Sequence, residues 1–120
     1  LIFFPFSFIS PMAESGSALK EQGNAAFKAG DLSTALSLYA SSVAAFSREK
    51  DSEGGALVQL NIALCYIKLS NHSSALDACD ASLKVDPANT KAHYRRALAL
   101  EGLGKPQEAL ASARAALRVD

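Results

Sequence analysis

The chain repeats itself at an interval of 34 residues, and this repeat restricts the fold more than any other feature of the sequence. When the sequence is shifted by that interval, small and apolar residues fall on residues of the same kind. The coinciding pairs are Ala63 and Ala97, Leu64 and Leu98, Leu69 and Leu103, Ala75 and Ala109, Leu76 and Leu110, Ala81 and Ala115, Leu83 and Leu117, Val85 and Val119, and Asp86 and Asp120. A single unit of this length cannot bury its apolar face alone, so we expect the units to stack around one continuous core.

A third copy lies upstream, at an offset of 40 residues. Its matches are Lys28 with Lys68, Asp31 with Asn71, Ser33 with Ser73, Ala35 with Ala75, and Leu36 with Leu76. We assign the additional residues to Ser47–Gly55, which is charged and glycine-rich as a longer connecting loop should be. The predicted repeats span approximately residues 17–50, 55–88 and 89–120, and residues 1–16 lie outside the domain.

Each copy carries the capping and turn residues of two helices joined by a tight connection. These residues are Ser17, Gly30 and Asp31 in the first copy, Asn71 in the second, and Gly104 and Pro106 in the third. Ser, Asp and Asn favour helix starts, Gly favours left-handed helix ends, and Pro favours the first helical turn. We expect the first helix to run from Ser17 to about Ala29. The sequence predicts an all-α fold, an α-solenoid of three tandem helix-turn-helix units without a sheet.

Composition excludes several classes of function. Lysine plus arginine and aspartate plus glutamate both number 12, and such a balance argues against general binding of nucleic acid or acidic membranes. Cys65 and Cys79 lack the spacing of metal ligands, so we interpret them as reduced core residues. His72 and His93 lie at predicted helix starts or on the surface. With no catalytic, phosphate-binding or metal motif, we expect neither enzymatic activity nor a cofactor.

The first nine residues, LIFFPFSFI, differ in character from everything that follows. They are too short to span a bilayer, Pro5 interrupts them, and they lack the cationic start of a secretory signal. Met12 opens a stretch that reads like an ordinary N-terminus. We interpret residues 1–11 as lying outside the functional protein, with a truncated signal or anchor as the alternative.

The third repeat holds three cations close together, at Lys91, Arg95 and Arg96. On a helix, Lys91 and Arg95 lie one turn apart, where like charges repel by a few tenths of a kcal/mol. Neither is followed four residues later by a compensating acid. Lys91 and Arg95 are either ordinary solvated charges on a helix surface or part of a binding site for an anion.

The period, the helix pairs and the small-residue pattern resemble the tetratricopeptide-repeat family. The matching residues are Gly23, Ala35 and Tyr39 in the first unit, Tyr66, Ala75 and Pro87 in the second, and Leu100, Ala109 and Ala116 in the third. The chain departs from the family pattern in having no Trp, and in Ser42 and Ser82, which replace a common Ala. The resemblance implies that the first helix of each unit lines a concave groove for a peptide.

Within the family, five residues match the dicarboxylate-clamp domains of co-chaperones. They are Lys20, Asn24, Asn61, Lys91 and Arg95, and they come from all three units. The resemblance implies that they hold the C-terminal Asp of a peptide, whose two carboxylates suit amide, ammonium and guanidinium donors. It also implies that the ligands are the Glu-Glu-Val-Asp tails of the cytosolic heat-shock chaperones of the seventy- and ninety-kilodalton classes.

Further predictions concern the surroundings of this set. Phe27, Lys28 and Lys68 lie one turn further along the groove and are secondary candidates for contact with the peptide. A core position is the alternative for Phe27, and Arg96 is interpreted as a solvated neighbour. We expect a cytoplasmic interaction module with no nucleic-acid or membrane partner. We also expect the array to be truncated before a capping helix, which would leave apolar surface exposed on the last helix at Leu110, Leu117 and Val119.

Two alternatives remain open. The chain is the targeting domain of a longer enzyme, such as a phosphatase, prolyl isomerase or ubiquitin ligase, or it is a scaffold for another acidic peptide. The sequence that follows in the gene would distinguish the first alternative, and dependence on a free C-terminal carboxylate would distinguish the second.

Overall fold

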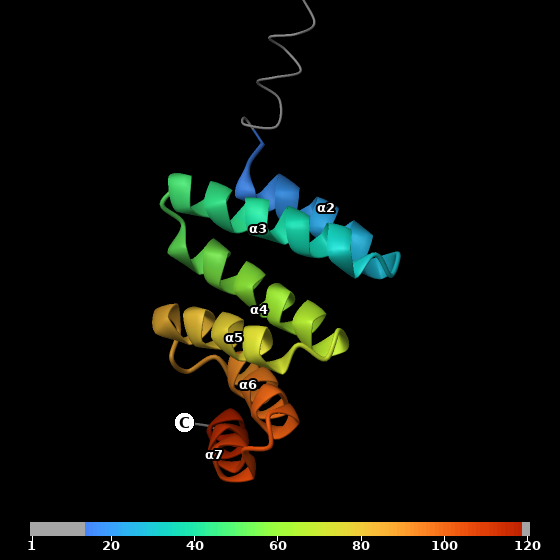
Figure 1. Ribbon diagram of the computed structural model, residues 1–120. Helices are drawn as coiled ribbons and strands as arrows, with labels where there is room; N and C mark the ends of the chain where they lie inside the picture. The colour runs from blue at the N-terminus through green and yellow to red at the C-terminus, as the bar shows by residue number, and fades with distance from the viewer. Residues whose placement is uncertain (1–13, 119–120) are drawn as a thin grey trace, which may run out of the picture.

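The computed structural model describes residues 14–118, and within this range the secondary structure is entirely helical. The helices are α2 (Gly16–Lys28), α3 (Leu32–Arg48), α4 (Ser52–Lys68), α5 (His72–Val85), α6 (Thr90–Gly102) and α7 (Pro106–Leu117). Figure 1 shows them stacked in chain order from α2 at the top to α7 at the bottom. Three helical hairpins, α2–α3, α4–α5 and α6–α7, form the stack, so the predicted solenoid of three units is confirmed.

The curvature of the stack follows from which helices touch. α4 contacts both α2 and α6, whereas α3 does not contact α5, and α5 does not contact α7, within the described chain. The first helices of the three hairpins therefore lie closer together than the second helices. The array curves toward α2, α4 and α6, and we call the face they form the inner face. The face formed by α3, α5 and α7 is the outer face.

The turns within the hairpins have the predicted chemistry. Gly30 and Gly104 adopt φ angles of 83° and 75°, a left-handed conformation that favours glycine. The Asp31 side chain accepts a hydrogen bond from the Thr34 amide at 3.1 Å, and Asn71 plays the same role at the start of α5. The first cap differs from the prediction, because Ser15 rather than Ser17 caps α2, and Ser17 lies inside the helix.

The additional residues of the first repeat lengthen helices and do not form a loop. α3 and α4 each contain 17 residues, and only Glu49–Asp51 separate them. Asp51 caps α4 by accepting from the Gly54 amide at 2.8 Å, so Gly54 lies inside a helix that begins before residue 55. A Cβ atom at Gly54 would lie 2.5 Å from the Phe46 ring. The interpretation of Ser47–Gly55 as a loop is wrong, because most of it is helical and Gly54 allows close packing between α3 and α4.

Small side chains allow the helices to cross closely. The fully buried alanines include Ala35, Ala63, Ala75 and Ala99, each on a different helix. The two serines that depart from the family pattern are also buried, and Ser42 donates its hydroxyl proton to the Gly16 carbonyl at 2.6 Å. Cys65 and Cys79 are buried free thiols, as predicted, and burial raises the pKa of Cys79 to about 11. At such a pKa the Cys79 thiolate, which is the reactive form, is scarce at neutral pH.

The last hairpin exposes apolar surface. Leu110 and Leu117 of α7 are 51% and 77% exposed, which confirms the expectation for these two residues. Val119, the third residue of that prediction, lies outside the described residues. Tyr94, Leu98 and Leu110 also line a cavity of about 350 Å³ between α6 and α7. No helix within residues 14–118 is both long enough and apolar enough to cross a membrane.

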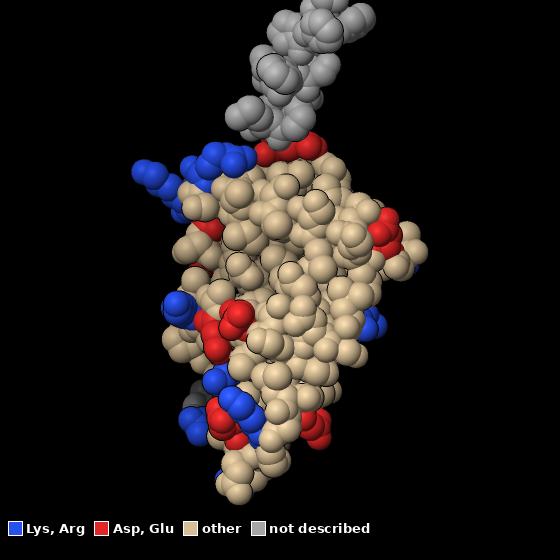
Figure 2. All heavy atoms as spheres, viewed as in Figure 1, with Lys and Arg blue, Asp and Glu red and all other residues tan. Residues whose placement is uncertain are grey.

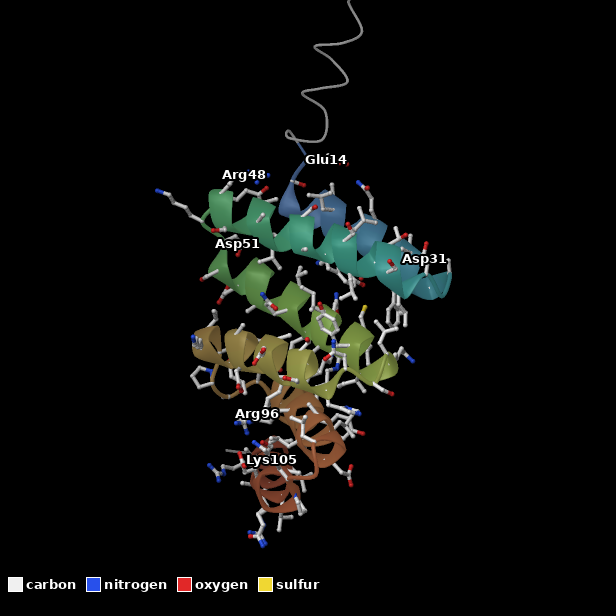
Figure 3. All side chains as sticks on the ribbon, in the orientation of Figure 1. Glu14, Asp31, Arg48, Asp51, Arg96 and Lys105 are labelled. Atoms are coloured by element: carbon white, nitrogen blue, oxygen red, sulfur yellow. The ribbon has the colours of Figure 1, made fainter. Side chains whose placement is uncertain are left out.

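Arg96 is a structural brace, and its interpretation as a solvated neighbour is wrong. Its Nε donates to Asp80 Oδ1 of α5 at 2.8 Å, and its Nη1 donates to Ser112 Oγ of α7 at 2.7 Å. The label in Figure 3 places Arg96 where α5, α6 and α7 come together. One guanidinium thus links the last three helices, because its donors point in several fixed directions.

Replacing Arg96 with alanine should lower the free energy of unfolding by about 1–2 kcal/mol, because Asp80 and the buried Ser112 lose their partner. The measurement is urea denaturation followed by circular dichroism, with Arg114→Ala on the exposed side of α7 as the matched control. Equal stabilities for the two variants would show that the brace contributes nothing.

Candidate peptide-binding site

The five candidate residues all lie on the helices of the inner face. Lys20 and Asn24 are one turn apart on α2, Asn61 is on α4, and Lys91 and Arg95 are one turn apart on α6. Lys91 is exposed and the other four are half-buried. Because α4 separates α2 from α6, Asn61 occupies the middle of the set, with two candidates on either side.

A hydrogen-bonded chain joins the candidates on α2 and α4. Asn61 Nδ2 donates to Asn24 Oδ1 across a long distance of 3.4 Å. The same Asn24 oxygen accepts a short hydrogen bond of 2.6 Å from the hydroxyl of Tyr39 on α3. The structure therefore brings Asn24 and Asn61 together and adds a residue, Tyr39, that the site prediction did not include.

Arg95 joins the third helix to the same region. Its Nη1 donates to the backbone carbonyl of Leu60 at 2.7 Å, and Leu60 directly precedes Asn61. Burial lowers the pKa of the Arg95 guanidinium. Arginine nevertheless remains protonated in proteins, so a positive charge is held beside Asn61. The donors of Arg95 that do not contact Leu60 remain available for an anion.

Lys20 and Lys91 are not brought into contact with the other candidates. Each lies one turn before the candidate that shares its helix, and neither forms a salt bridge within residues 14–118. The described salt bridge belongs to Arg96 and Asp80 instead. Three of the five candidates, Lys20, Lys91 and Arg95, are therefore cations without a paired acid among the described residues.

The secondary candidates have different surroundings. Phe27 packs against the core formed by the first two repeats, and Lys68 Nζ lies 5.8 Å from the centre of its ring. This cation–π contact joins the end of α2 to the end of α4. Lys28 is exposed in the last turn of α2.

The side of the molecule on which α3, α4 and α5 meet contrasts with the inner face. Figure 2 shows a surface over α3, α4 and α5 that is largely free of charge, with lysine, arginine and acidic residues gathered at its margins. A cavity of about 350 Å³ on this side lies between α3, α4 and α5 and is lined by Val43, Ala56 and Val85 among others. The cation that lines this cavity, Lys50, stands beside Asp51, whereas the candidate cations of the inner face have no paired acid among the described residues.

The family model of the tetratricopeptide repeat matches residues 20–90 and 60–120. The chain belongs to the tetratricopeptide-repeat family. Among relatives, it is 36% identical over 96 residues to Protein unc-45 homolog B of Danio rerio, covering 78% of this chain and 10% of the relative. It is 38% identical over 93 residues to human Sperm-associated antigen 1, covering 78% and 9%. The chain thus spans about a tenth of the length of these relatives.

Tetratricopeptide domains of solved structure have the same fold. The second such domain of Spaghetti (RPAP3), bound to the HSP90 peptide SRMEEVD, gives a TM-score of 0.79 at 29% identity, covering 87% of this chain and 91% of that one. The second domain of human RPAP3, in complex with the HSP70 peptide SGPTIEEVD, gives 0.76 at 30% identity, covering 85% and 80%. Both neighbours are bound to peptides of the acidic class that the resemblance implied.

Proposed function

We propose that this tetratricopeptide array is a co-chaperone-type interaction module that binds the acidic C-terminal tail of cytosolic heat-shock chaperones. The main observation in support is that Asn24, Asn61 and Arg95 lie close together on the inner face. Asn61 contacts Asn24 Oδ1, and Arg95 contacts the carbonyl of Leu60, the residue before Asn61. The peptides bound by the two RPAP3 domains support the same ligand class. A cytosolic partner implies that the module acts in the cytoplasm.

The donor set suits a C-terminal aspartate. Such a residue presents a main-chain and a side-chain carboxylate close together, with a combined charge of minus two. In this proposal Lys20, Asn24 and Asn61 bind the main-chain carboxylate, and Lys91 binds the side-chain carboxylate with help from Arg95. Charge-assisted hydrogen bonds contribute about 1.5–3 kcal/mol each before the cost of ordering a flexible tail. The net affinity should therefore be about micromolar.

A fluorescence anisotropy titration tests the proposal. A labelled peptide ending in Met-Glu-Glu-Val-Asp should bind with a dissociation constant of about micromolar order, and its C-terminally amidated twin should bind at least about tenfold more weakly because it lacks one carboxylate. Lys91→Ala should weaken binding of the free acid, whereas Lys84→Ala on α5 should not. Equal binding of both peptides, or of neither, would contradict the clamp and leave an array for a different partner.

A further inference from the structure

Tyr39 lies directly beneath the proposed site. It is 2% exposed on α3, and a Cβ atom at Gly23 would approach its ring to 2.6 Å. The absence of a side chain at Gly23 therefore lets the ring pass against the backbone of α2. Its hydroxyl then reaches the next residue along α2, Asn24. Tyr39 matches the family pattern as a packing residue, but its hydroxyl also forms a hydrogen bond with Asn24, one of the candidate donors.

This contact and the one from Asn61 together fix the orientation of the Asn24 amide, because a hydroxyl alone could donate to the amide oxygen or accept from the NH₂ group. Burial raises the pKa of the Tyr39 hydroxyl, so the group stays protonated and donates its proton to Asn24 Oδ1 at 2.6 Å. Asn61 Nδ2 approaches the same oxygen, so flipping the Asn24 amide alone would set two NH₂ groups against each other. Asn24 Nδ2 has no hydrogen-bond partner within residues 14–118 and is not among the buried unpaired atoms, so it meets solvent.

The fold of a repeat does not need this polar pair. The positions equivalent to Asn24 and Tyr39 hold Leu64 and Cys79 in the second repeat and Leu98 and Ala113 in the third. Those pairs are apolar or nearly so, and their hairpins form the same structure. A buried hydroxyl that must find a partner is harder to accommodate than an apolar group. The first repeat therefore contains a buried hydroxyl that needs a hydrogen-bond partner, and this partner is the proposed donor Asn24.

We propose that Tyr39 is a positioning residue that makes the site select a C-terminal carboxylate over a carboxamide. Tyr39 and Asn61 both donate to Asn24 Oδ1 and so hold the Asn24 NH₂ group as the donor toward the ligand, and Asn24 cannot turn its oxygen toward the NH₂ of an amidated peptide. Asn61 Nδ2 carries two hydrogens, so it keeps one directed at Asn24 and has the other for the ligand. This inference rests on the proposed binding of a C-terminal carboxylate.

The test measures how strongly each variant distinguishes the free acid from the amidated peptide. Tyr39→Phe keeps the ring against Gly23 and removes only the hydroxyl. It should weaken binding of the free acid by about fivefold while leaving the amidated peptide unchanged or slightly tighter, since a released Asn24 can present either end of its amide. Tyr94→Phe, which removes an exposed hydroxyl from α6, is the matched control and should behave like the unaltered protein.

A double-mutant cycle separates positioning from packing. In an Asn24→Ala background, Tyr39→Phe should change binding of the free acid by less than about twofold, because the group that the hydroxyl orients is gone. An unaltered acid-to-amide ratio in Tyr39→Phe would overturn the inference while leaving the proposed function intact. A full fivefold loss in the Asn24→Ala background would also overturn it, because the hydroxyl would then act elsewhere. If the unaltered protein does not distinguish the two peptides, the proposed function fails and the inference fails with it.

Discussion

Replacing Phe46 with alanine should lower the free energy of unfolding by about 3–5 kcal/mol, the range observed when a buried aromatic ring is removed. Phe46 lies near the end of α3 and is 6% exposed. Cβ atoms at Gly16 and Gly54, the glycines at the starts of α2 and α4, would each lie 2.5 Å from its ring. The ring thus fills the space where α2, α3 and α4 meet.

Urea denaturation followed by circular dichroism measures this loss, and Leu117→Ala on α7 is the control. Leu117 is mostly exposed, so its truncation should change stability by less than about 0.5 kcal/mol. A loss below about 1 kcal/mol in Phe46→Ala would mean that the helix ends close over the vacated space, contrary to the rigid contact inferred from the two glycines.

Periodic features of the fold could be predicted because each rests on local chemistry. The 34-residue interval and the third copy at an offset of 40 residues indicated the three hairpins, and the capping residues Asp31 and Asn71 act as their types suggest. Gly54 was misjudged because a glycine in sequence signals conformational freedom, whereas in the folded chain its lack of a side chain admits Phe46. The sequence alone cannot distinguish a glycine needed for its backbone freedom from one needed for its small size, because the second need arises only where α3 and α4 cross.

In the proposed site, too, the features that depend on local sequence could be predicted, and those that depend on helix packing could not. The spacing of Lys20 and Asn24, and of Lys91 and Arg95, is enough by itself to place each pair on one helical stripe. The hydroxyl of Tyr39 could not be assigned in that way, because its contact with Asn24 depends on how α3 packs on α2. One signal was present, since a polar pair in the first repeat stands where the other repeats hold apolar pairs.

Reversing the charge of Lys91 should separate binding from stability. Lys91 is the second residue of α6, where the positive end of the helix dipole disfavours a cation, and Arg95 adds repulsion one turn later. Lys91→Glu removes both the unfavourable interaction with the helix dipole and the repulsion from Arg95, so the melting temperature should stay the same or rise slightly. The same substitution places a negative charge against the aspartate side chain of the proposed ligand, and binding should weaken by at least about 100-fold.

Lys84→Glu, in the last turn of α5, alters the net charge equally and serves as the control. Its effect on peptide binding should be smaller than about threefold at physiological salt, because exposed charges beyond a Debye length of about 8 Å are largely screened. Comparable losses in both variants would mean that overall charge, rather than a donor at Lys91, attracts the peptide. A clear fall in the melting temperature of Lys91→Glu would mean that this lysine supports the fold. If Lys91→Glu folds as well or better and binds the peptide more weakly, then Lys91 costs some stability and strengthens binding, and this exchange would explain why a neutral chain stacks two cations on one helix.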